Sequence, residues 1–170
     1  MGNKKYAKLV ASYFYYILPH ELLSCEASVK AYRKFKKQVV ETDSNEEIQI
    51  KLIGVCRPIA EKYYQKYSKE KKKLEGHLFS SKIESLKSAY IRPIQLDMGP
   101  WRQLARESNF EDLDLLIWHQ ILGIPKETVA YSLLETRGTI HLRLSKSLSK
   151  LSLLVQPGRK EPSTEGGANA

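Results

Sequence analysis

Apolar side chains recur at intervals of three and four residues through most of this 170-residue chain. That period places them on one face of an α-helix, and alternation typical of strands is nearly absent. The sequence therefore predicts an all-α fold. Helices are expected over about 5–18, 20–40 and 46–73, with a second helical unit over about 101–155. Pro58 interrupts the apolar stripe of the third helix and predicts a kink or a split there.

The segment between the two helical units has a different composition. Lysines crowd 69–73, and serine, glycine and proline follow as far as Pro100, a pattern typical of a linker. We expect a first small helical domain over 1–73, a linker over 74–100 and a second small helical domain over 101–155. The final segment, 156–170, has almost nothing to bury and predicts a disordered tail.

The net charge of +9 favours a nucleic-acid or anionic-membrane partner. No apolar run is long enough to span a bilayer, so we expect a soluble cytoplasmic protein without membrane insertion. Cys25 and Cys56 are predicted to be small buried side chains in a reduced compartment. The four histidines lack metal-ligand spacing, and no phosphate-binding glycine loop or nucleophile elbow occurs. We therefore expect no metal, no cofactor and no catalysis.

The region from Ile124 to Leu151 predicts a helix-turn-helix. Gly138 is expected to form its turn, and Thr139 to open the second helix. No acidic residue falls between Thr136 and Lys160. A basic, acid-free helix suits a surface that lies against DNA phosphates. The candidate DNA-binding residues are Arg137, Thr139, His141, Leu142, Arg143, Lys146 and Lys150.

Within this helix, Arg143 could pair with guanine or clamp a phosphate, and Leu142 could touch a thymine methyl. Lys146 and Lys150 suit phosphate contacts. The alternative is that these are ordinary solvated charges on a bundle helix. Four acidic residues precede the helix and are expected at the surface, where they face a partner protein or aid solubility. They are Glu107, Glu111, Asp112 and Asp114.

Tyrosines and lysines alternate around residues 62–69. Such a stripe could stack unpaired bases while the lysines hold the backbone. Equally, Tyr63 and Tyr67 could pack inward and leave the lysines solvated.

The chain, apart from its tail, resembles the extracytoplasmic-function sigma factors of bacterial RNA polymerase. Residues 138–140 and then Arg143, Leu144 and Lys146 resemble the family's Gly-Thr-Val turn and its Arg-Leu-basic pattern. Residues 52–73 are similar to the family's Ile-Ala-Arg-Asn, aromatic and basic segment, and residues 20–32 to its polymerase-docking helix.

The resemblance implies a promoter-recognition subunit, in which the first domain opens DNA and the second reads the upstream element. The implied partners are core RNA polymerase, promoter DNA and an anti-sigma factor. Candidate polymerase contacts are Glu21 and Glu26. Candidate contacts to single-stranded DNA are Arg57, Lys62, Tyr63, Tyr64 and Lys66.

The sequence also departs from the family pattern. Leu22 and Cys25 stand where the family usually has Asp and Gln, and Pro58 replaces an Asn. The loop over 41–47 is acidic, whereas a loop that captures a DNA strand should not repel phosphates. The alternatives are therefore a sigma-like DNA-binding regulator, or a protein-interaction decoy that no longer melts promoter DNA.

Overall fold

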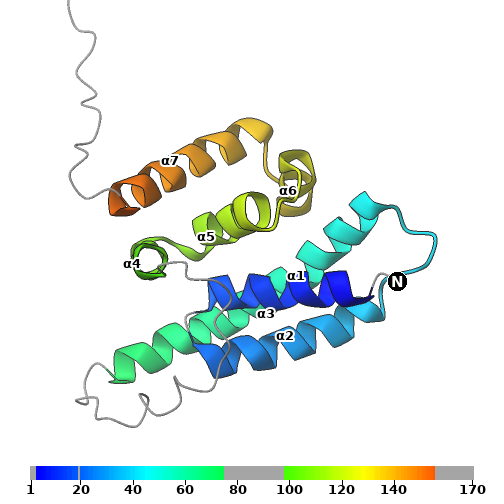
Figure 1. Cartoon of the computed structure of the whole chain (residues 1–170), viewed down its shortest axis with the longest axis horizontal. Coiled ribbons are helices and arrows are strands. Elements are labelled where there is room, and N and C mark those ends of the chain that lie inside the picture. Colours follow the sequence, from blue (N-terminus) through cyan, green and yellow to red (C-terminus); the bar gives the residue numbers. More distant parts are fainter. Residues whose placement is uncertain (1–2, 19, 75–97, 156–170) are drawn as a thin grey trace, which may run out of the picture.

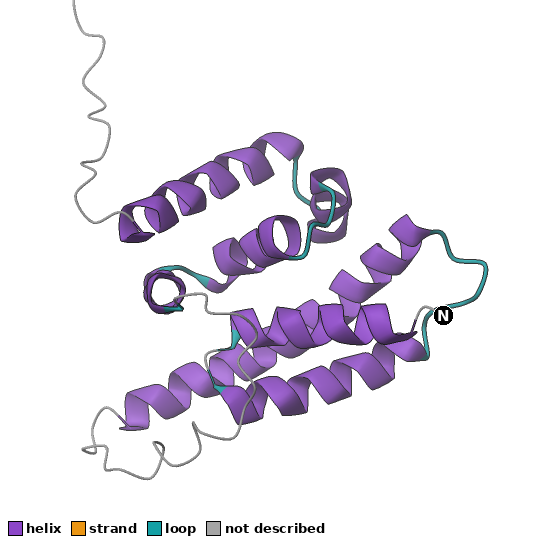
Figure 2. Cartoon of the chain, in the orientation of Figure 1, coloured by secondary structure: helices purple, strands orange, loops and turns teal. Residues whose placement is uncertain are grey.

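The computed structural model describes residues 3–18, 20–74 and 98–155, with side chains over 4–18, 20–67 and 98–155. All regular structure in these ranges is helical (Figure 2), which confirms the predicted all-α class. The expected linker lies almost wholly outside the described residues, and the expected tail lies entirely outside them. None of the described helices is long and apolar enough to cross a membrane.

The first part contains three helices: α1 (Asn3–Ile17), α2 (Glu21–Lys36) and α3 (Asn45–Leu74). The starts of α2 and α3 each have a local cause. The His20 ring nitrogen Nδ1 accepts a hydrogen bond from the backbone N–H of Leu23 at 3.3 Å and caps α2. Ser44 and Glu47 form a reciprocal capping box at the start of α3, with hydrogen bonds of 3.2 and 2.7 Å.

Helix α2 ends at Lys36, earlier than the predicted boundary near residue 40. The Asp43 carboxylate accepts the backbone N–H of Val40 at 2.7 Å and pairs with Lys51 at 2.6 Å. These contacts lower the pKa of Asp43, the hydrogen bond from Lys51 contributing most. They also hold the chain in a turn and stop α2 from extending.

Helix α3 continues unbroken through Pro58, so of the predicted kink or split the split is wrong. A proline inside a helix frees the carbonyl four residues earlier, which here belongs to Gly54. Both Gly54 and Pro58 are exposed. Water can therefore reach the freed carbonyl, and the side chains on the opposite face stay packed.

The second part contains α4 (Gly99–Glu107), α5 (Phe110–Leu116), the π-helical turn η2 (Ile117–Ile121), α6 (Lys126–Leu133) and α7 (Arg137–Val155). Asn109 caps the start of α5, and its side chain accepts the backbone N–H of Asp112 at 2.8 Å. Helix α7 packs on α4, α5 and α6. The expected helical unit over 101–155 thus consists of several short helices and one long one.

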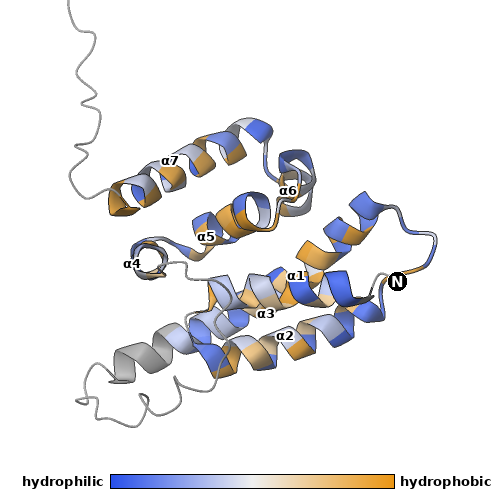
Figure 3. Cartoon of the chain, in the orientation of Figure 1, coloured by the Kyte–Doolittle hydropathy of each residue, from blue (hydrophilic) through white to orange (hydrophobic). Residues whose placement is uncertain are grey.

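The two parts pack directly against each other. Helix α5 lies between α7 and the first three helices (Figure 1), and α6 contacts α3. Figure 3 shows apolar segments of α1 and α5 on the facing sides of the two parts. The buried side chains of both parts form one continuous cluster, which includes Tyr13 and Trp118. Residues far apart in the sequence therefore share one core.

Candidate nucleic-acid interface

The predicted helix-turn-helix is formed by α6 and α7, but its turn is not at Gly138. Leu134 adopts the left-handed conformation, with φ 56° and ψ 36°, and ends α6. The hydroxyl of Thr136 accepts the backbone N–H of Thr139 at 3.2 Å and caps α7, which begins at Arg137. Gly138 lies inside α7, where an added Cβ would meet only the Thr136 hydroxyl at 3.9 Å. The expectation that Gly138 forms the turn and Thr139 opens the helix is therefore wrong.

Helix α7 presents a basic outward face. Ile140, Leu144 and Ser147 turn toward the core. The helix contains no acidic residue. Most of the candidate DNA-binding residues are exposed on it: Arg137, Thr139, His141, Leu142 and Lys146. Lys150 is half-buried. The candidate residues thus share one helix and leave a positively charged surface open.

Arg143 differs from the other candidates because its guanidinium already has partners. Its Nε donates to the Asp112 carboxylate at 2.8 Å, and a terminal nitrogen bonds Glu135. Partial burial acts to lower the pKa of Arg143, but the two carboxylates raise it overall. Asp112, on α5, serves this ion pair rather than lying free at the surface. DNA contact by Arg143 stays a prediction and would compete with these bonds.

Asp114 connects the two parts at a buried junction. Its side chain has no exposed surface. One carboxylate oxygen accepts hydrogen bonds from the Tyr13 hydroxyl at 2.6 Å and the Trp118 indole at 2.7 Å. The other oxygen lies 3.1 Å from Nε of Arg57, in an ion pair not aligned for a hydrogen bond. The Tyr13 ring stacks on Trp118 with centroids 4.1 Å apart. Helices α1 and α3 therefore meet α5 and η2 at one carboxylate.

Burial sets the protonation behaviour of this junction. Removal from water raises the pKa of Asp114 to about 6, although Tyr13, Arg57 and Trp118 each oppose the rise. Burial, followed by the charge of Asp114, raises the pKa of the Tyr13 hydroxyl well above its usual value. The expectation that Asp114 lies at the surface is wrong.

The candidate single-strand contacts divide into two groups. Lys62 and Lys66 are exposed on α3. Tyr63 is buried and its hydroxyl donates to Glu26 at 2.6 Å, a bond that raises the pKa of Tyr63 to about 12. Tyr64 is half-buried, and its ring packs on Phe110 with centroids 5.4 Å apart. Arg57 is held at Asp114. Of the two interpretations of the tyrosine stripe, the structure favours inward packing for Tyr63.

The candidate polymerase contacts Glu21 and Glu26 are both exposed on α2. Glu26 accepts the bond from Tyr63, so two residues from separate predicted sites pair with each other. Cys56 is buried as expected, but Cys25 is exposed on α2, which corrects the prediction for that residue. Within the described ranges, no three His, Cys, Asp or Glu side chains gather where they could hold a metal ion.

Sequence reasoning missed the junction at Asp114. One signal was present: Asp114 is a single acid inside an otherwise apolar run, from Leu113 to Trp118. An acid in such a run is either a break in the apolar face or a buried group with partners. The partners could not be named from spacing, because Tyr13 lies 101 residues earlier in the chain.

No protein-family model matches the chain, and none of the curated proteins searched is similar to it in sequence. Among solved structures, the chain is similar to the sigma factor RpoE in its co-crystal structure with the anti-sigma factor NepR from Bartonella quintana. The TM-score is 0.67 at 17% sequence identity, and the match covers 94% of this chain and 100% of that one. The chain therefore has the fold of that sigma factor.

Proposed function

We propose that this protein is a sigma-type transcription factor of the extracytoplasmic-function class, which directs core RNA polymerase to promoters through α6 and α7. The observation that carries the proposal is the outward face of α7. It is basic, acid-free and exposed, and it follows a helix-turn-helix on a sigma-factor fold. Phosphate contacts from Lys146 and Lys150 would position the helix, and exposed side chains near its start would face base edges.

The proposed partners are core polymerase and promoter DNA, in the cytoplasm. An anti-sigma factor is a further proposed partner, because the sigma factor RpoE was crystallised with one. The residues proposed for single-strand contact are Arg57, Lys62, Tyr63, Tyr64 and Lys66. Those proposed for polymerase are Glu21 and Glu26. Arg57, Tyr63 and Tyr64 would have to leave their present contacts before they could bind a DNA strand.

That requirement favours a second candidate function. Arg57 pairs with Asp114, Tyr63 with Glu26, and Tyr64 with Phe110. A protein that keeps these contacts would bind duplex DNA or a protein partner without melting a promoter. It would then be a sigma-like regulator or a decoy.

Co-purification with bacterial core RNA polymerase, followed by run-off transcription from genomic fragments, separates these functions. A stable complex with defined start sites is the result that the sigma-factor proposal expects. A complex without transcription would replace it with the decoy. Salt-sensitive duplex binding without any polymerase complex would replace it with a stand-alone regulator.

The α7 surface is tested separately by duplex-DNA binding over a range of salt concentrations. If Lys146 contacts a phosphate, Lys146→Ala should weaken binding to all sequences and reduce the slope of log affinity against log salt by about one. Lys8→Ala, which removes an exposed lysine from α1, is the matched control. Equal slopes for the two variants would exclude Lys146 from the interface.

A further inference from the structure

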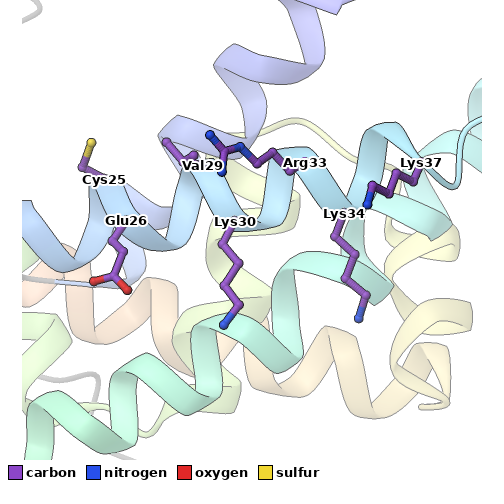
Figure 4. Close-up of a pocket in the computed structure, with 7 residues that line it drawn as sticks. All are labelled: Cys25, Glu26, Val29, Lys30, Arg33, Lys34 and Lys37. Atoms are coloured by element: carbon purple, nitrogen blue, oxygen red, sulfur yellow. The ribbon is translucent and has the colours of Figure 1, made fainter.

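Two arginine side chains show the difference between a cation that is open to anions and one that is not. Arg33 on α2 is exposed beside Lys30 and Lys34 along a shallow groove (Figure 4), and it forms no ion pair with another described residue. Arg143 on α7 keeps only 20% of its side chain exposed and pairs with two carboxylates. Its guanidinium is therefore engaged within the protein, although it belongs to the basic helix.

The two carboxylates that hold Arg143 come from different elements. Asp112 lies in the first turn of α5, and its carboxylate accepts a hydrogen bond from Nε of Arg143 at 2.8 Å. Glu135 lies in the turn between α6 and α7, where its backbone N–H donates to the Ala130 carbonyl at 3.0 Å. The Glu135 carboxylate bonds a terminal nitrogen of Arg143. This set of Arg143, Asp112 and Glu135, called the clamp below, ties the second turn of α7 to α5 and to the turn after α6.

The charge of the clamp does not suit a contact with DNA. One guanidinium faces two carboxylates, so the clamp is net negative. A phosphate that approached Arg143 would meet both carboxylates at the same place and would be repelled by them. If Arg143 instead moved out to the DNA, it would leave Asp112 and Glu135 partly buried and unpaired. Either arrangement opposes direct contact.

The clamp lies next to the part of α7 that would face bases. In a helix-turn-helix, side chains near the start of the second helix contact base edges, and they must be held in one orientation to do so. The apolar packing of Ile140 and Leu144 beneath α7 is non-directional, whereas the charge-assisted hydrogen bonds of Arg143 are directional. The exposed residues on these first turns are Arg137, Thr139, His141 and Leu142.

We infer that Arg143 is a positioning residue rather than a DNA contact, and that the clamp fixes the first two turns of α7 against α5 and the preceding turn. The exposed side chains of those turns then meet DNA in one orientation. The part of this inference that concerns DNA rests on the proposed function, whereas the fixing of α7 does not. It gives Arg143 a role different from the guanine or phosphate contact expected from the sequence.

Asp112→Asn separates the two roles, because they predict changes of opposite sign. If Arg143 contacts DNA, its release from Asp112 and the loss of a negative charge should both tighten binding. If Arg143 positions α7, loss of the clamp should weaken binding several-fold. Glu111→Gln is the matched control, since it removes an exposed acid from the same first turn of α5 and should leave binding unchanged or slightly tighter.

Fluorescence anisotropy measures this with the full chain and a labelled duplex that the native protein has selected from a random-sequence pool. Circular dichroism checks that each variant folds. Arg143→Ala should weaken binding without changing the slope of log affinity against log salt, whereas loss of a phosphate contact would reduce that slope by about one. Adding Asp112→Asn to Arg143→Ala should weaken binding no further, because both changes remove the same clamp. Tighter binding by Asp112→Asn, or a reduced slope for Arg143→Ala, would overturn the inference.

Amide hydrogen exchange in the free protein tests the clamp without DNA. In Asp112→Asn, the amides of residues 141–147 should exchange several-fold faster than in Glu111→Gln, and their acceleration should exceed that of the amides of α2, which the clamp does not touch. Unchanged exchange in α7, or equal acceleration in α2, would overturn the inference. If the native protein binds no duplex at all, the proposed function fails, and the exchange result still decides whether the clamp fixes α7.

Discussion

Asp114 is the residue whose chemistry depends most on its surroundings. It is buried with a pKa of about 6, higher than the value of about 3.9 for an unfolded aspartate. The folded state therefore binds the proton more tightly than the unfolded state. The resulting stabilisation is fully present below about pH 4 and is lost as the pH rises through about 6.

Asp114→Asn should remove this pH dependence, because the amide does not titrate but still accepts the bonds from Tyr13 and Trp118. Between about pH 4 and pH 7, the free energy of unfolding of the native protein should fall relative to that of the variant by roughly 2–3 kcal/mol. Chemical denaturation at several pH values measures the difference. Glu61→Gln, which alters an exposed acid, should keep the native profile. If the free energy of unfolding depends on pH in the same way for the native protein and for Asp114→Asn, Asp114 does not have a raised pKa in the folded protein.

Arg143 gives a second prediction at this scale. Arg143→Ala leaves Asp112 and Glu135 partly buried without their shared cation, so it should lower the free energy of unfolding by about 1–3 kcal/mol. Lys146→Ala, on the exposed face of the same helix, should change it by less than about 0.5 kcal/mol. Equal stabilities in urea denaturation would show that the ion pairs contribute nothing.

At the scale of elements, the turn between α6 and α7 has a strained backbone, because a leucine rather than a glycine occupies its left-handed position. Leu134 holds a left-handed conformation with its side chain 93% exposed. A side chain with a Cβ pays about 1–2 kcal/mol in that conformation. Glycine would avoid the penalty, although it gains more freedom in the unfolded chain.

Leu134→Gly should therefore stabilise the protein by about 0.5–1 kcal/mol, a rise in Tm of a few degrees for a chain of this size. Differential scanning calorimetry measures it. Leu142→Gly is the control, because it removes another exposed leucine but from the interior of α7. That variant should be destabilised by about 1 kcal/mol. A loss of stability in Leu134→Gly would show that its side chain makes contacts that outweigh the strain.

At the scale of the whole molecule, the two parts should unfold together because they share one core. Both tryptophans lie in the second part and contact the first, Trp118 through the Tyr13 ring and Trp101 through the Tyr16 carbonyl. Their fluorescence therefore reports on the second part and its junction with the first, whereas circular dichroism reports on all helices. The two thermal transitions should coincide in the native protein. Tyr13→Ala removes the ring that stacks on Trp118 and the bond to Asp114, at a cost of about 3–5 kcal/mol. The transitions of that variant should separate, with Tyr13→Phe intermediate. Separate transitions in the native protein would contradict a shared core.

The sequence by itself determined the helices and the character of α7. Periodicity and the absence of acids after Thr136 are local properties, so they predicted the all-α class and the basic helix correctly. Helix boundaries were less certain, because α2 stops at a turn held by Asp43 and Lys51.

Only the tertiary structure decided how the parts join and which candidates are free. Asp114 is buried because Tyr13, Arg57 and Trp118 meet it there, and two of these lie in the other part of the chain. Sequence spacing cannot encode such an encounter, since burial of a charge depends on which distant groups supply its bonds. Tertiary contacts also decide the position of the turn. Leu134 rather than Gly138 adopts the strained conformation, because packing of α6 against α3 and α7 outweighs the local conformational preference.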